Sequence, residues 1–136
     1  MDAYADRFHT AMGQLKRKMV QEFTSRLEAG LTYPQFFLLH FIQDKGSCKA
    51  SELAERMEVK PSAITVMIDR LVNNGYVVRC PDESDRRVYR IELTEKGRQM
   101  LDEKNEIRKE IARRYLSKLD AGEAERFLQT LEKLAK

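Results

Sequence analysis

The feature that most constrains the fold is a pair of short helices followed at once by an arginine-bearing hairpin, between residues 50 and 94. The sequence predicts a first helix over about 50–57 and a second over about 61–74, opened by Pro61. The second helix has apolar residues at the i, i+3, i+4, i+7 spacing of a buried face, which are Ile64, Met67, Ile68 and Leu71. Two helices joined by a tight turn are typical of a helix-turn-helix.

The hairpin is predicted from two β-like runs, Tyr76 to Cys80 and Arg87 to Leu93, with Tyr89, Ile91 and Leu93 on one face. The six-residue link from Pro81 to Arg86 is longer than a tight turn needs and suits a projecting loop. We therefore predict a mainly α-helical chain with a small β-hairpin, arranged as a winged helix. That fold is most often used to bind duplex DNA.

Two further helices are predicted before this region. Residues 4–29 carry an apolar residue every three or four positions, and Gly30 is expected to end that helix. Thr32 and Gln35 form a capping box for the next helix. That helix is apolar on nearly all sides, so we expect it to be buried on more than one side and to lie in a subunit interface.

Two helices are predicted after the hairpin. Thr94 caps a helix over about 95–118, whose charge-rich first half is expected to form a solvated arm. Asp120 and Glu123 form a capping box for a last helix with an apolar stripe. The amphipathic first and last helices bury their stripes most economically by packing together and against a second copy. We predict one domain over 1–136, with a DNA-binding lobe at about 32–98 and dimerisation helices at about 4–29 and 95–136.

The bulk composition excludes several classes of protein. The formal net charge is only +3, so any preference for DNA must come from where the charges lie. No apolar run approaches the roughly 20 residues of a membrane span, and no signal-peptide pattern opens the chain, so we expect a cytoplasmic protein without a membrane partner. Cys48 and Cys80 have no metal-type spacing and are expected to be free thiols. We expect no metal and no cofactor.

The outward face of helix 61–74 has small side chains near its N-terminus and an arginine further along. Small residues allow close approach to a major groove, hydroxyls bond phosphates or base edges, and alanine or valine contacts thymine methyls. The helix N-terminus also favours a phosphate. Taken alone, this face fits an ordinary surface helix equally well. The candidate DNA-contacting residues here are Lys60, Ser62, Ala63, Thr65, Val66 and Arg70.

Arg86 and Arg87 are predicted at the tip of the hairpin, where they can reach a narrow, electronegative minor groove. Asp85 lies two residues before Arg87, so its carboxylate can hold that guanidinium in one orientation. Residues 79–90 contain four arginines but also three carboxylates, and a solvated, salt-bridged turn is the alternative. The position of the hairpin directly after a helix-turn-helix pattern favours DNA contact.

Three segments together resemble the MarR family of transcriptional regulators: SELA at 51–54, ITxxIDRLxxxGYVxR at 64–79 and DRRxxxIxLTEKG at 85–97. The resemblance implies a homodimeric winged helix, joined through its first and last helices, that binds pseudo-palindromic operators and usually represses. It gives Arg87 the role of the wing arginine in the minor groove and Asp85 that of its positioning partner. Ser62, Thr65 and Val66 fall where the family meets bases or phosphates. Many members have a larger polar or basic residue at position 66.

The resemblance also implies control by a small aromatic or anionic effector, held between the dimer helices and the DNA-binding lobe. The candidate pocket residues are His9, Met12, Tyr33, Phe37 and Phe41, although aromatic residues at helical spacing also occur in ordinary cores. Redox-sensing relatives place a cysteine in the first helix, and this chain has none there, so oxidation sensing by Cys48 or Cys80 is not expected. Two isolated histidines do not suit zinc sensing.

Two other classes of function are alternatives to DNA recognition. A winged helix that binds proteins without specific DNA recognition is the main alternative, and the cationic hairpin argues against it. An enzyme would need a nucleophile and base, a phosphate-binding glycine loop or clustered carboxylates, and no such pattern is present.

Overall fold

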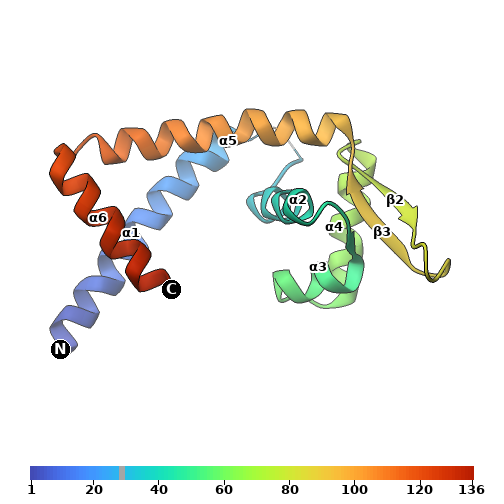
Figure 1. The fold of residues 1–136 in the computed structure, drawn as a ribbon, viewed down its shortest axis with the longest axis horizontal. Coiled ribbons are helices and arrows are strands. Elements are labelled where there is room, and N and C mark those ends of the chain that lie inside the picture. The colour runs from blue at the N-terminus through green and yellow to red at the C-terminus, as the bar shows by residue number, and fades with distance from the viewer. Residues whose placement is uncertain (28–29) are drawn as a thin grey trace. The chain divides into compact units, whose positions relative to one another are not determined.

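The computed structural model describes residues 1–27 and 30–136. The helices are α1 (Asp2–Ser25), α2 (Tyr33–Lys45), α3 (Ala50–Met57), α4 (Pro61–Asn73), α5 (Glu95–Leu116) and α6 (Ala121–Ala135), and the strands are β1 (Cys48–Lys49), β2 (Val77–Pro81) and β3 (Tyr89–Leu93) (Figure 1). The chain divides into a winged-helix unit, Leu27–Asn105, and a terminal-helix unit, Met1–Arg26 with Glu106–Lys136. Among the described residues, no helix is both long and apolar enough to cross a membrane.

The sheet of the winged-helix unit is antiparallel, with the order β1-β3-β2. The β2–β3 hairpin pairs Val77 with Leu93 and Pro81 with Tyr89, and residues 82–88 form the projecting loop, which we call the wing. The mainly helical chain with a small hairpin is confirmed. The short strand β1, which pairs with β3 through Cys48 and Ile91, was not predicted.

The core of the winged-helix unit is built around α2. Phe36, Leu38, Leu39 and Ile42 of this helix are fully buried, and the predicted inner face of α4 is buried at Ile64, Ile68 and Leu71. The predicted capping box is present: the Gln35 N–H donates to Thr32 Oγ1 (3.2 Å), and the Thr32 N–H donates to Gln35 Oε1 (3.0 Å). We expected α2 to lie in a subunit interface because it is apolar on nearly all sides. The single chain already buries it on several sides, so its apolar surface does not require a second subunit.

The start of α5 is fixed to the hairpin. Thr94 Oγ1 accepts the Gly97 N–H (3.0 Å) and donates to the Gly75 carbonyl (2.6 Å), so Thr94 is the predicted cap. Gly97 lies so close to the Tyr76 backbone that a Cβ would overlap the carbonyl oxygen of Tyr76. The absence of a side chain at position 97 therefore allows α5 to leave the sheet at this point.

Two predictions about helices are wrong. The first half of α5 is not a solvated arm, because Met100, Leu101 and Lys104 are buried. With Gly97 they form an i, i+3, i+4, i+7 stripe, which a count of apolar residues misses because a glycine and a lysine belong to it. The first helix ends at Ser25 rather than Ala29. Residues 28 and 29, within the predicted helix, lie outside the described residues.

In the terminal-helix unit, the C-terminal part of α1 pairs with α5. Phe23 and Ile111 are buried, Arg26 Nη1 lies 3.2 Å from Glu110 Oε2, and Glu22 forms an ion pair with Arg114. Of the rest of the predicted stripe on α1, Leu15 and Met19 are half-buried and Phe8 and Met12 are exposed, and the whole stripe on α6 is exposed. The exposed apolar side chains are Tyr4, Phe8 and Met12 on α1 and Phe127, Leu128, Leu131 and Leu134 on α6.

Candidate nucleic-acid interface

The exposed face of α4 is the one that the sequence predicted. Ile64, Ile68 and Leu71 fix the helix to the core, so the side chains of the opposite face are directed to solvent. Val66 stands out, because half of a large apolar side chain is exposed there. All six candidates on or beside this helix are exposed: Lys60, Ser62, Ala63, Thr65, Val66 and Arg70.

The start of α4 is held by backbone groups rather than by a hydroxyl cap. The Lys60 carbonyl accepts the N–H groups of Ala63 and Ile64 (3.0 and 3.1 Å). Thr65 Oγ1 donates its proton to the Pro61 carbonyl (2.9 Å), so the hydroxyl presents its lone pairs outward. In this geometry Thr65 can accept from a base amino group, such as that of adenine or cytosine, and rotation of the hydroxyl lets it donate to a phosphate instead.

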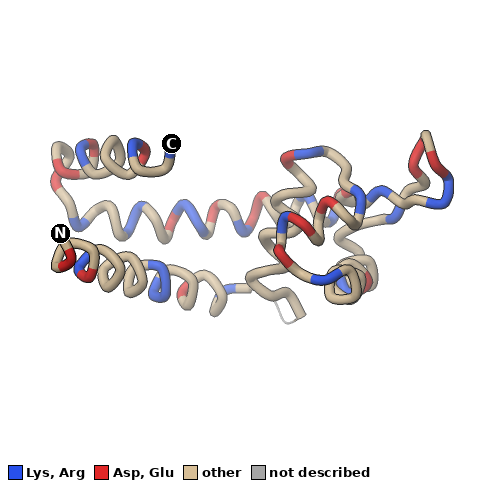
Figure 2. The backbone as a smooth tube through the Cα atoms, turned by 90° about the horizontal axis from the view of Figure 1, so that it is seen from below, with Lys and Arg blue, Asp and Glu red and all other residues tan. Residues whose placement is uncertain are grey.

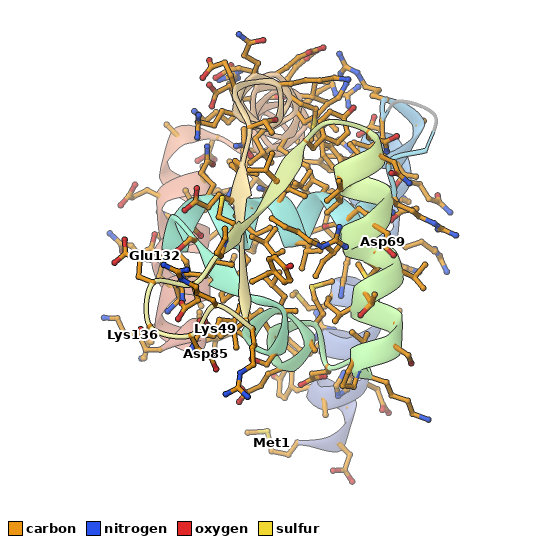
Figure 3. The ribbon with its side chains drawn as sticks, turned by 90° about the vertical axis from the view of Figure 1, so that its right-hand side faces the viewer. Met1, Lys49, Asp69, Asp85, Glu132 and Lys136 are labelled. Atoms are coloured by element: carbon orange, nitrogen blue, oxygen red, sulfur yellow. The ribbon has the colours of Figure 1, made fainter. Side chains whose placement is uncertain are left out.

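An ion pair between Asp69 and Arg79 connects α4 to β2. Asp69 is exposed, and Figure 3 labels it on α4. The pair was not predicted, since the two residues belong to different elements and each looks like an ordinary surface charge in the sequence. It removes Arg79 from the arginines available to phosphates and holds the helix against the sheet.

The wing carries the predicted ion pair between Asp85 and Arg87. Asp85 Oδ1 accepts both the backbone N–H of Arg87 (3.0 Å) and its side-chain Nε–H (3.3 Å). The Arg87 side chain is nevertheless 91% exposed, so the guanidinium is oriented without being covered. Arg86 is exposed beside it. Figure 2 shows the acidic and basic residues following one another around this loop.

The base of the wing has two features that the sequence did not reveal. Tyr89, predicted on one face of the strand with Ile91 and Leu93, is 54% exposed, because it pairs with Pro81 at the outer end of the ladder, beyond the core. Asp82 is buried although it is charged. Burial opposes ionisation of Asp82, but hydrogen bonds from the N–H groups of Asp85 and Ser84 and from Arg90 lower the pKa of this carboxyl below its usual value.

A cavity of about 400 Å³ lies between α2 and α3. Three of the predicted pocket residues, Tyr33, Phe37 and Phe41, line it, and its other lining residues are Pro34, His40, Asp44, Arg56 and Met57. Asp44 and Arg56 were not predicted, because each looks like a surface residue of its own helix, whereas His40 was considered as a ligand contact from the sequence. His9 and Met12, also predicted for the pocket, are exposed on α1 in the terminal-helix unit.

The cysteines lie in the sheet and are not activated. Cys48 is buried in β1, and burial followed by the nearby Glu52 carboxylate raises the pKa of its thiol. The Cys80 Sγ lies 3.5 Å from Glu92 Oε2, and desolvation together with that carboxylate raises the pKa of its thiol. Both thiols thus stay protonated at neutral pH. Within the described part of the chain, no group of three or more His, Cys, Asp or Glu residues is arranged to hold a metal ion.

The fold and the exposed arginines of the wing define a winged-helix protein of the DNA-binding class. The MarR family model matches residues 31–89. The HTH-type transcriptional repressor MdtR of Bacillus subtilis is 41% identical over 122 residues, which are 89% of this chain and 79% of that protein. The chain belongs to the MarR family.

Solved structures show the same fold. The YusO protein from Bacillus subtilis is 37% identical, with a TM-score of 0.81 over 99% of this chain and 96% of that one. A mutant MarR from E. coli complexed with operator DNA is 26% identical, with a TM-score of 0.71 over 96% of this chain and 93% of that one. Family membership makes this protein a sequence-specific DNA-binding transcriptional regulator and not an enzyme, which decides against the protein-interaction alternative.

Proposed function

We propose that this protein is a homodimeric repressor that acts in the cytoplasm and binds a pseudo-palindromic operator in double-stranded DNA. Each protomer inserts the N-terminal part of α4 into a major groove and places its wing at the adjacent minor groove. The similar MdtR protein is named a transcriptional repressor, which supports repression rather than activation by this protein.

The observation that carries this proposal is the oriented, exposed Arg87 in the same compact unit as the exposed face of α4. The contacts divide by chemistry. Arg87, held by Asp85, enters the minor groove, while Lys60, Arg70 and Arg86 neutralise phosphates. Ala63 and Val66 contact thymine methyls, and Ser62 and Thr65 bond base edges or phosphates. Because no bidentate base reader is among them, much of the specificity comes from DNA shape.

Selection from a randomised duplex library tests the proposal. We expect an inverted repeat whose half-sites lie about one helical turn, or 10–10.5 base pairs, apart. Arg87→Ala should weaken binding to the selected duplex by about 5- to 100-fold and reduce the salt slope of log K by about one. Arg87→Lys keeps the charge and should recover only part of the loss. Enrichment of no motif, or equal affinity for scrambled duplexes at matched salt, contradicts the proposal.

We also propose that a small aromatic anion relieves repression from the cavity between α2 and α3. The ring faces of Tyr33, Phe37 and Phe41 suit an aromatic ligand, and Arg56 supplies a cation. The Asp44 carboxylate lies 3.5 Å from His40 Nδ1, which leaves the guanidinium of Arg56 as the group for the anion. Since α3 is the first helix of the helix-turn-helix, a ligand at this site contacts the DNA-binding unit directly.

A further inference from the structure

The wing is joined to the body of the winged-helix unit by a series of polar contacts that begins at the turn after α2. Arg90 on β3 donates from Nε to Ser47 Oγ (2.8 Å) and from Nη2 to the Ser47 carbonyl (3.1 Å). Its remaining terminal nitrogen, Nη1, lies 3.4 Å from Asp82 Oδ1. One guanidinium thus touches both the turn and the first residue of the wing.

Asp82 continues the series into the loop. Its Oδ2 accepts the backbone N–H groups of Ser84 and Asp85, both at 3.1 Å, and its own N–H donates to the Val88 carbonyl (2.9 Å). A carboxylate that accepts backbone N–H groups two and three residues ahead fixes the course of the chain there. The side chain of Asp82 is also buried, with 9% exposed, so water cannot replace these partners at no cost.

The last step leads to the tip. Asp85, whose N–H is held by Asp82, holds both the backbone and the side chain of Arg87 through Oδ1. The Val88 N–H donates to the Asp85 carbonyl (3.0 Å), which closes the loop on its other side. The orientation of Arg87 therefore depends, through Asp85 and Asp82, on Arg90 and Ser47.

We propose that Asp82 and Arg90 are positioning residues for DNA binding: they hold the wing in the conformation that presents Arg87, without contacting DNA themselves. The inference rests on the proposed function. Each of the three guanidinium nitrogens of Arg90 donates to a partner within the protein, and only 28% of its side chain is exposed, against 91% for Arg87. Holding the loop before DNA arrives reduces the conformational entropy that binding would otherwise cost.

The sign of the effect separates positioning from simple electrostatics. Asp82→Asn removes a negative charge from a DNA-binding loop, so Coulomb attraction alone predicts tighter binding. Loss of the positioning contacts predicts weaker binding, because an asparagine oxygen is a poorer acceptor than a carboxylate and pairs less well with Arg90. The neighbouring Glu83 is exposed and provides the matched control, since Glu83→Gln removes the same charge from the same loop.

The experiment measures the affinity of the dimer for the selected duplex, well below the melting temperature of every variant. We expect Asp82→Asn to bind roughly tenfold more weakly than the wild type and Glu83→Gln to bind equally or slightly more tightly. In an Arg87→Ala background, Asp82→Asn should cost little, because the group it positions is gone. Arg90→Lys keeps the positive charge but loses the planar guanidinium that contacts Ser47 and Asp82 at the same time. It should weaken binding to a similar extent as Asp82→Asn.

Two results overturn the inference. One is an Asp82→Asn protein that binds as tightly as Glu83→Gln. The other is an Asp82→Asn penalty that is the same with and without Arg87, since the residue then acts through some other route. A wild-type protein that prefers no duplex instead overturns the proposed function, and that outcome is seen before any variant is compared.

Discussion

At the scale of single residues, Arg56 is the group that decides what the cavity between α2 and α3 accepts. Its guanidinium lies 5.6 Å from the centre of the Phe41 ring, and Lys45 lies 6.0 Å from the same ring, but of these two cations Arg56 lines the cavity. We expect benzoate or salicylate at millimolar concentration to raise the melting temperature of the wild type. Arg56→Ala should abolish this shift, and Lys45→Ala, the matched control, should keep it.

A neutral analogue tests the part played by charge at the same site. If Arg56 pairs with the carboxylate of the ligand, benzamide should produce a much smaller shift than benzoate. Equal shifts for the two compounds, or an unchanged shift in Arg56→Ala, would show that the anion is not recognised by this residue.

At the scale of elements, the junction between the hairpin and α5 depends on Gly97. Gly97→Ala places a methyl group against the Tyr76 carbonyl oxygen, where backbone on both sides limits adjustment. We expect a loss of about 1–3 kcal/mol in the free energy of unfolding, measured by urea denaturation. Gly13→Ala in α1 meets no atom within 4 Å and should be neutral or stabilising by up to about 1 kcal/mol. A Gly97→Ala protein as stable as the wild type would refute the close-contact argument.

The elements also show how far the sequence could predict this molecule. The capping boxes at Thr32 and Asp120 were predicted and are present, because a cap is a contact between residues three apart. The two-residue strand β1 was missed, because two residues carry no alternation and the strand exists only through pairing with β3. The buried face on the first half of α5, which includes a glycine and a lysine, was missed for a related reason. Its burial depends on the elements that pack against it and not on its own composition.

In the candidate site too, contacts between residues close in the sequence could be predicted, and contacts between distant elements could not. The Asp85–Arg87 contact was predicted because the two residues are two positions apart and adjacent in one loop. The contacts that hold the wing from below join Ser47 to Arg90, 43 positions along the chain, and no local pattern marks them. The Asp69–Arg79 pair needs the helix to pack on the sheet before it can form. Sequence patterns thus identified the contacting residues, and the fold identified what holds them.

At the scale of the whole molecule, the terminal-helix unit carries the interface of the proposed homodimer. The apolar side chains on α6 recur at 127, 128, 131 and 134, which is one helical face, and all are at least 36% exposed in the single chain. A face of this kind, with a further exposed stripe on α1, is what a second copy of the chain would cover. The proposed homodimer then places two winged-helix units on one operator.

Leu131→Glu tests this assembly by placing a charge in the middle of the α6 stripe. Light scattering at micromolar concentration should give twice the chain mass for the wild type and a single chain mass for the variant, since burying an unpaired carboxylate in an interface is strongly unfavourable. Operator affinity should fall by about 100-fold or more, because the second half-site is no longer linked to the first. Gln129→Glu adds the same charge on the opposite side of α6 and should remain dimeric and bind DNA. A monomeric wild type, or a Leu131→Glu protein that stays dimeric, contradicts the assignment of α6 to the interface.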